Sequence, residues 1–189
     1  MMRQRLARTI ARVMRYEMVG SVPQRGVLVG APHTSNWDFL TMLLVMWHGG
    51  AHPRVLVKKE LFSGPVGWLV RGLGGVPLDR ENAGGVVQAL VEEAGGDEEF
   101  RLVIAAEGTR SAGEYWKSGF LRIARDANLP VTLAFFEPAT KTMGFGPSFV
   151  PSGDFRADMQ IVRDFYADKV GLKPQNRTEP RLREELTQD

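Results

Sequence analysis

Short apolar runs alternate along this chain with longer segments in which apolar residues recur every three or four positions. Runs of four to eight residues rich in Val, Leu and Ile are typical of buried strands, and the longer period is typical of amphipathic helices. This order predicts an α/β fold, a single domain with a largely parallel central sheet flanked by helices. Strands are predicted at residues 27–30, 54–58, 75–80, 101–106 and 130–136, with an edge strand at 145–150. Helices are predicted at residues 36–47, 61–73, 85–94, 119–127 and from 154 to about 170.

The first segment of the chain is predicted to form a basic amphipathic helix. Such a helix can lie in the headgroup layer of an anionic membrane. It can equally pack on its own domain with its arginines in solvent, and the sequence leaves both alternatives open. The basic positions are Arg3, Arg5, Arg8, Arg12 and Arg15, and the apolar positions at helical spacing are Met2, Leu6, Ile10, Val13 and Met14.

Composition and charge narrow the class of protein. A chain of 189 residues is by default one domain, taken here as residues 21–172, with the helical segment 1–20 before it. A polar tail, residues 173–189, is expected to be loosely ordered apart from one or two helical turns. A net charge of +2 argues against nucleic acid as a partner. The absence of cysteine excludes disulfides and cysteine nucleophiles, and it fits a reducing, cytosolic setting. No run reaches the ~18 apolar residues that a membrane-spanning helix needs, and no secretory signal is evident.

One chemical motif follows the first predicted strand and contains His33 and Asp38. Residues five apart on a straight helix differ by about 140° in direction, so the pair can meet only if His33 lies in a loop and Asp38 in the first helical turn. Ser35 or Asn36 would cap that helix. Asp38 can then orient one imidazole nitrogen and leave the other as a general base, with backbone N–H groups beside His33 as donors to an oxyanion. The alternative is a purely structural hydrogen bond at a helix start.

A second motif, residues 107–111, reads Glu-Gly-Thr-Arg-Ser and follows another strand. Gly108 permits a tight turn, and Arg110 can bind a phosphate through two parallel hydrogen bonds. Arg80 is a second candidate guanidinium. The alternative for each segment is an internal ion pair with a neighbouring carboxylate. Because ligands of α/β sheets bind outside the carboxyl ends of strands, His33 and Glu107 are predicted to share one rim.

The histidines and tryptophans offer further alternatives. Besides His33 the chain has only His48 and His52, and glycines between them argue against the continuous helix that a metal site there would use, so no metal is expected. The tryptophans can lie at a membrane interface, line an acyl groove or simply pack in the core. They are Trp37, Trp47, Trp68 and Trp116.

The order of the motifs resembles that of the glycerolipid acyltransferases, the family of the 1-acylglycerol-3-phosphate acyltransferases. The segment from His33 to Asp38 resembles the H-x4-D motif of that family, and Ser35 matches a common serine in it. Residues 107–111 match the E-G-T-R-S motif letter for letter. With the two segments described next, the resemblance spans residues 32–131.

The remaining segments of the resemblance lie between and after these two. Residues 75–80 look like the second motif of the family, whose arginine, here Arg80, is associated with the acceptor phosphate. Residues 129–131 look like the fourth, apolar-proline motif, associated with the acyl site. Lys117 and Gly119 resemble the lysine–glycine step that follows the third motif.

The resemblance implies direct transfer of a fatty acyl group to a hydroxyl of a lysophospholipid such as 1-acylglycerol 3-phosphate. The implied donor is a thioester of coenzyme A or acyl carrier protein, with no cofactor or metal, and His33 is the implied base with Asp38 as its orienting partner. A peripheral position on the cytoplasmic face of an anionic membrane is implied too, which favours the membrane alternative for segment 1–20. The residues implied for the acceptor and its phosphate are Arg80, Glu107, Gly108, Thr109 and Arg110, and those for the acyl donor or acyl site are Ser35, Lys117, Leu129 and Pro130.

The chain departs from the family pattern in two respects. Pro32 stands before the histidine, where the family often has asparagine. The chain is short and looks most like a short bacterial subgroup, so glycerol 3-phosphate, another lysolipid and a non-phosphorylated alcohol also remain open as acceptors.

Three other functions compete with acyl transfer. An esterase or thioesterase would use the same His33–Asp38 pair to activate water. A non-catalytic module would bind lipid or acyl-coenzyme A at a membrane surface without chemistry. A structural protein that binds phosphate is the third alternative.

Overall fold

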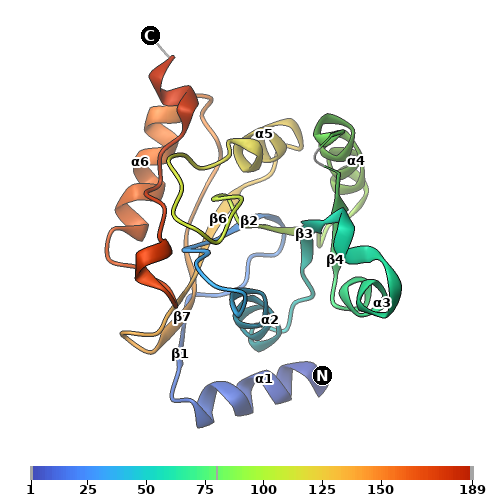
Figure 1. The fold of residues 1–189 in the computed structure, drawn as a ribbon, viewed down its shortest axis with the longest axis vertical. Coiled ribbons are helices and arrows are strands. Elements are labelled where there is room, and N and C mark those ends of the chain that lie inside the picture. The colour runs from blue at the N-terminus through green and yellow to red at the C-terminus, as the bar shows by residue number, and fades with distance from the viewer. Residues whose placement is uncertain (1, 80, 188–189) are drawn as a thin grey trace.

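A seven-stranded sheet forms the centre of the computed structural model, which describes residues 2–79 and 81–187 (Figure 1). The strand order is β1-β7-β6-β2-β5-β3-β4. All neighbouring strands are parallel except β6 and β7, which form an antiparallel pair. The strands are β1 (Glu17–Val19), β2 (Gly26–Gly30), β3 (Arg54–Lys58), β4 (Gly75–Leu78), β5 (Arg101–Ile104), β6 (Val131–Glu137) and β7 (Thr142–Phe149).

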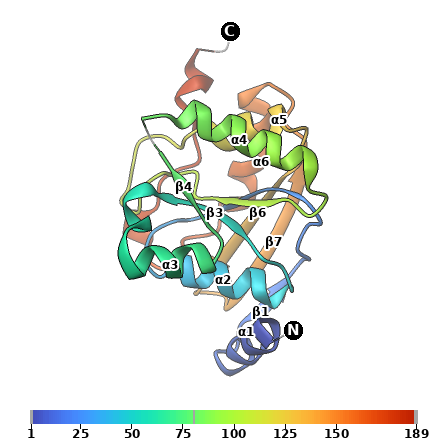
Figure 2. The same ribbon diagram turned by 90° about the vertical axis from the view of Figure 1, so that its right-hand side faces the viewer.

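Helices cover both faces of this sheet. One layer holds α1, α2 and α3, and the other holds α4, α5 and α6, as Figures 1 and 2 show from two directions. The predicted α/β fold with a largely parallel sheet is therefore confirmed. The α-helices are α1 (Met2–Val13), α2 (Asp38–His48), α3 (Gly64–Gly72), α4 (Ala83–Gly96), α5 (Gly119–Asp126) and α6 (Phe155–Tyr166), and the short 3₁₀ helices are η1 (Lys59–Phe62), η2 (Pro174–Asn176) and η3 (Arg183–Leu186).

The core has two parts, one on each face of the sheet. Successive residues of a strand point to opposite faces, so Val27 and Val29 of β2 join the part under α4, α5 and α6, while Leu28 joins the part under α1 and α2. All three side chains are fully buried. This burial on both faces explains why β2 appears in the sequence as a continuous apolar run.

The predicted position of one strand in the sheet was wrong. Residues 145–150 were expected to form an edge strand, but β7 lies inside the sheet between β6 and β1. Glu17 of β1 pairs in parallel with Thr142 of β7. β1 has only three residues, which is too short for an alternating apolar pattern to predict it.

α1 packs on the domain through its small side chains. Ala7 and Ala11 are buried, and the Gln4 side chain donates a hydrogen bond to the carbonyl of His48 over 3.4 Å. Small side chains let two helices approach closely, which accounts for the contact of α1 with α2. The larger apolar side chains predicted to form its apolar side all face outward: Met2 is 85% exposed, Leu6 54%, Ile10 38%, Val13 76% and Met14 48%.

Residues 173–187 of the tail contain the helical turns η2 and η3, as expected, but the segments around these turns are well packed and not loosely ordered. Leu182 is 1% exposed and forms a bridge with Trp116. The Trp116 indole N–H donates to the carbonyl of Thr178 over 3.1 Å. Isolated buried residues and single hydrogen bonds anchor this tail, and neither produces a periodic pattern in the sequence.

No helix in the described part of the chain is long and apolar enough to span a bilayer.

Candidate active site

The loops after β2 and β5 form the candidate site. These two strands are adjacent and parallel, with Val29 opposite Ile104, so their carboxyl ends lie side by side. His33 follows the first strand and Glu107 follows the second, and the backbone N–H of His33 donates to Glu107 Oε1 over 2.6 Å. The shared rim predicted from the sequence is therefore present.

His33 and Asp38 face each other, as the sequence predicted. His33 lies in the loop, Asp38 is the first residue of α2, and Nδ1 of the imidazole is 3.2 Å from Oδ2 of the carboxylate. The His33 side chain is 23% exposed and that of Asp38 13%. A carboxylate that accepts a hydrogen bond from Nδ1–H favours the tautomer in which Nε2 is unprotonated, which is the arrangement of a general base.

The same carboxylate also organises the loop. Asp38 Oδ2 accepts hydrogen bonds from the backbone N–H groups of Thr34 and Ser35, over 2.6 and 2.7 Å. The predicted cap at Ser35 or Asn36 was wrong, because the N-cap residue is Trp37 and no side chain caps it. Ser35 is buried, and its hydroxyl accepts the N–H of Trp37 over 3.3 Å within this turn.

These contacts also bear on the expected oxyanion donors. The N–H groups of Thr34 and Ser35 donate to Asp38, and that of His33 donates to Glu107. The backbone N–H groups of these three consecutive residues are thus engaged with carboxylates. The structure gives no support to their role as free oxyanion donors.

Glu107 lies beneath the site and not on its surface. It is 3% exposed, and burial raises the pKa of its carboxyl to about 7 despite the hydrogen bond from His33. Its second oxygen, Oε2, is buried without a hydrogen-bond partner among the described residues. Glu107 thus holds the backbone of the His33 loop, and its contact with an acceptor stays a prediction.

After Glu107, the remaining residues of the second motif, 108–111, are exposed. Gly108 has φ +68°, a left-handed conformation, and an added Cβ would lie 3.2 Å from Cγ of Lys117. The predicted tight turn at Gly108 is thus present, and it leaves Thr109 and Arg110 exposed. Lys117 is also exposed and lies beside the turn because its backbone N–H donates to Ala106 over 2.7 Å. Among the described residues, neither Arg110 nor Lys117 is part of an ion pair, which makes the rim at this turn electropositive.

Several residues that sequence reasoning missed brace the His33 loop. Thr34 accepts hydrogen bonds from the tail: its hydroxyl from the N–H of Lys173 over 3.0 Å, and its carbonyl from the side chain of Asn176, also over 3.0 Å. The buried Tyr166 hydroxyl lies within hydrogen-bond distance of two strand carbonyls, 2.8 Å from that of Val29 on β2 and 2.9 Å from that of Ala134 on β6. No local motif marks these contacts, because they join positions up to 142 residues apart.

Two of the remaining predicted residues, Leu129 and Pro130, lie away from this site. Arg80 lies outside the described residues. Leu129 and Pro130 precede β6, and the Pro130 carbonyl accepts the N–H of Val27 near the amino end of β2. They therefore lie at the amino ends of the strands, opposite to the carboxyl ends where His33 lies, and Leu129 is fully buried in the core.

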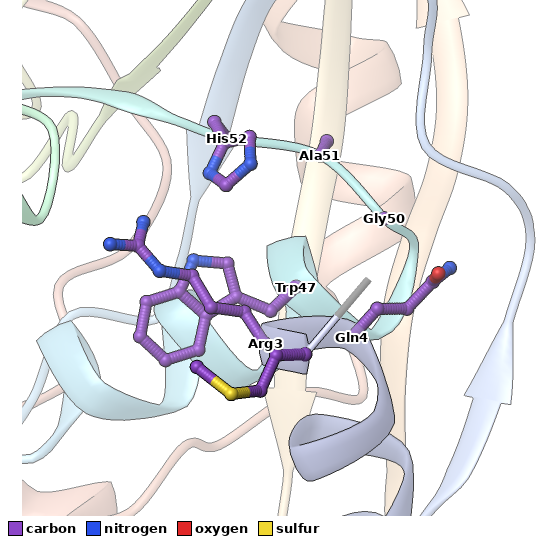
Figure 3. Close-up of a pocket in the computed structure, with 7 residues that line it drawn as sticks. Arg3, Gln4, Trp47, Gly50, Ala51 and His52 are labelled. Atoms are coloured by element: carbon purple, nitrogen blue, oxygen red, sulfur yellow. The ribbon is translucent and has the colours of Figure 1, made fainter.

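A separate cavity of about 300 Å³ lies between the start of α1 and the end of α2 (Figure 3). The Arg3 guanidinium stacks over the Trp47 ring there, 5.4 Å from its centre, and His52 lies on the strand-side wall. His33 precedes the other end of α2, an eleven-residue helix about 16 Å long. The described residues contain no group of three or more His, Cys, Asp or Glu side chains that could hold a metal ion.

The sequence profile of the acyltransferase family matches residues 12–134, which include both loops of the site. The chain belongs to the acyltransferase family. The fold of this acyltransferase is similar to the crystal structure of PlsC, the 1-acyl-sn-glycerophosphate (LPA) acyltransferase of Thermotoga maritima. The TM-score is 0.56, and 80% of this chain and 68% of that chain are covered at 20% sequence identity. No curated protein sequence matches the chain.

Proposed function

We propose that this acyltransferase transfers a fatty acyl group from a thioester to a hydroxyl of a lysophospholipid such as 1-acylglycerol 3-phosphate. The observation that carries the proposal is the contact of His33 with Asp38, 3.2 Å apart, on the same rim as the exposed Arg110. One part of the rim is suited to remove a proton and the other to hold an anionic headgroup.

In this mechanism His33 acts through Nε2. It accepts the proton of the acceptor hydroxyl as the oxygen attacks the thioester carbonyl, and Asp38 stabilises the imidazolium that forms. The tetrahedral intermediate then releases the thiolate, which takes the proton back from Nε2. Because the thioester is already activated, no nucleophile from the protein and no cofactor is required.

The acceptor headgroup is assigned to the electropositive part of the rim. The guanidinium of Arg110 can bind a phosphate through two hydrogen bonds, and the ammonium of Lys117 adds a point charge beside it. Arg80 is kept as a third proposed phosphate ligand on the sequence resemblance alone. Coenzyme A and acyl carrier protein present the same thioester, so either serves as donor in this mechanism.

The proposal places the enzyme at an anionic membrane surface, on its cytoplasmic face. Support comes from α1, whose large apolar side chains face outward while its small ones pack on the domain. Exposed arginines of the same helix are suited to lipid phosphates.

Thiol release from acyl-coenzyme A tests the chemistry. A thiol-reactive dye reports the product without background from the protein, since the chain has no cysteine. Release is expected only with an acceptor from a panel of lysolipids and glycerol 3-phosphate, and it should be lost in His33→Ala and reduced in Asp38→Asn. Release without acceptor would instead establish a thioesterase, and release that survives His33→Ala would remove His33 from the mechanism.

A further inference from the structure

Exposed large apolar side chains are unevenly distributed over the molecule. Among the described residues, twelve of the fifteen lie between positions 2 and 69, on β1 and on the layer of α1, α2 and α3. Only Val150, Ile161 and Leu186 lie elsewhere. A concentration of exposed apolar side chains on one layer points to an interaction site in a soluble domain.

Six of the twelve side chains between positions 2 and 69 lie on η1, on α3 and at the start of α2, and we call this group the α3 surface. Trp68 is its most exposed member at 80%, and Leu69 is 54% exposed. α3 sits closely on η1 because Gly67 faces it: an added Cβ there would lie 2.1 Å from the carbonyl oxygen of Phe62. The α3 surface consists of Leu61, Val66, Trp68 and Leu69 on η1 and α3, with Trp37 and Leu40 at the start of α2.

The α3 surface adjoins the catalytic rim. Trp37 directly precedes Asp38, the partner of the His33 imidazole. η1 and α3 follow the carboxyl end of β3, the same end of the parallel strands at which the His33 and Glu107 loops lie. Figure 2 shows α3 and α2 on one face of the sheet, with α1 beneath them.

Charge indicates what covers this face. Residues 1–72 hold ten basic and three acidic side chains, a net charge of +7, whereas residues 73–189 hold fourteen and nineteen, a net charge of −5. The apolar and the basic side chains therefore concentrate in the same part of the chain. An anionic lipid layer matches both, because its phosphates attract Lys and Arg while tryptophan and leucine enter the boundary of the acyl chains.

We propose that the α3 surface is a second lipid-docking surface, which together with α1 holds the catalytic rim against an anionic membrane. The identity of the lipid that reaches His33 rests on the proposed function, but docking itself does not. An acceptor held in the lipid layer could then present its hydroxyl to Nε2 without leaving the membrane.

Flotation with vesicles tests the docking directly. The variant Trp68→Ser/Leu69→Ser should bind vesicles of phosphatidylglycerol and phosphatidylcholine roughly tenfold more weakly than the parent, with an unchanged melting temperature because both side chains are exposed. The single variant Trp68→Phe keeps an aromatic side chain and should retain most of the binding of the parent. The matched control Ile161→Ser/Leu186→Ser removes two exposed apolar side chains from the opposite layer and should bind as the parent does.

Equal flotation of Trp68→Ser/Leu69→Ser and the parent would overturn the proposal. A loss of the same size in Ile161→Ser/Leu186→Ser would overturn it too, because exposure alone would then explain the effect. If the variant floats normally but no longer binds acyl carrier protein, the α3 surface docks that protein and not lipid.

Activity separates this proposal from the proposed function. The variant should turn over a short-chain, fully dissolved lysolipid at the parent rate and lose rate only on acceptor embedded in vesicles. If no acceptor supports thiol release while flotation still depends on Trp68 and Leu69, the proposed function fails and the docking surface stands. If the vesicle-embedded acceptor is turned over equally by the variant and the parent, the docking surface has no part in acceptor delivery and the proposal fails.

Discussion

The two helical layers of this acyltransferase cover the same sheet but differ in how they use apolar side chains. In α5 and α6 large apolar residues such as Phe120 and Met159 point into the core and are fully buried, and Ile161 of α6, which is 38% exposed, is an exception. In α1 and α3 the inward positions include Ala7, Ala11 and Gly67, and larger side chains point outward. The layer of α4, α5 and α6 therefore leaves few large apolar side chains exposed, whereas the layer of α1, α2 and α3 fills the other part of the core through α2 and exposes apolar side chains of α1 and α3.

The candidate active site at the His33 and Glu107 loops lies between these two layers and depends on both. α2 of the outward-facing layer supplies Asp38, while the tail packed against the other layer braces Thr34. Substitutions in different parts of the molecule should therefore affect different measurable properties. Side chains of the first layer should affect folding, those of the second should affect membrane binding, and those of the rim should affect chemistry.

The largest expected effect is on the rim. His33→Ala should lower the rate of acyl transfer by roughly 10²–10⁴-fold because the acceptor hydroxyl loses its base. Initial rates of thiol release with a lysolipid acceptor measure this loss. Vesicle flotation of the same variant should match that of the parent, and a parallel fall in binding would mean that rim and docking layer are not separable.

A matched pair of leucines compares the layers directly. Leu121 of α5 is 2% exposed and Leu6 of α1 is 54% exposed. Leu121→Ala should lower the free energy of unfolding by about 3 kcal/mol through lost burial and a cavity, whereas Leu6→Ala should change it by less than ~0.5 kcal/mol. Urea unfolding of both variants measures the difference, and similar losses would show that α1 belongs to the core after all.

Burial of Glu107 predicts a pH dependence of stability. Its native pKa of about 7 lies above the unfolded value of 4.5, so the native protein binds this proton more tightly. The stability from the protonated carboxyl is complete below about pH 4.5 and falls as pH rises through about 7, by about 3 kcal/mol in total.

Glu107→Gln keeps an acceptor for the His33 N–H but cannot titrate. Its free energy of unfolding should therefore fall less between pH 5 and 8 than that of the parent, as urea unfolding at each pH would record. Parallel pH curves for the two proteins would mean that Glu107 does not titrate in this range.

The smallest expected effect concerns the arginines of α1. Arg5→Gln/Arg12→Gln removes two exposed charges and should weaken binding to anionic vesicles by about 2 kcal/mol at low salt. Binding to neutral vesicles should not change. Arg122→Gln/Arg125→Gln, on α5 of the opposite layer, is the matched control. Equal losses in the two double variants would indicate that net charge, and not the face it lies on, governs the attraction.

The sequence predicted those features that depend on local pattern. Continuous apolar runs located β2, β3, β5 and β6, and helical spacing located each of the helices, with bounds within a few residues of those observed. The approach of His33 to Asp38 was also predictable, since both belong to one loop and the helix turn that follows it. The shared rim followed from a general rule, because parallel strands place their carboxyl ends together.

Tertiary structure alone decided which surfaces are buried and which residues meet from distant parts of the chain. Periodicity showed that α1 has an apolar side, but only packing showed that Ala7 and Ala11 face the domain. The E-G-T-R-S motif suggested an acceptor ligand at Glu107, but only the fold showed that this carboxyl lies under the His33 loop. The sequence pattern also did not predict the packing of the tail, strand β1 or the hydrogen bond from Asn176 to Thr34. Each of these features depends on contacts between segments far apart in the chain, and the pattern of neighbouring residues does not predict such contacts.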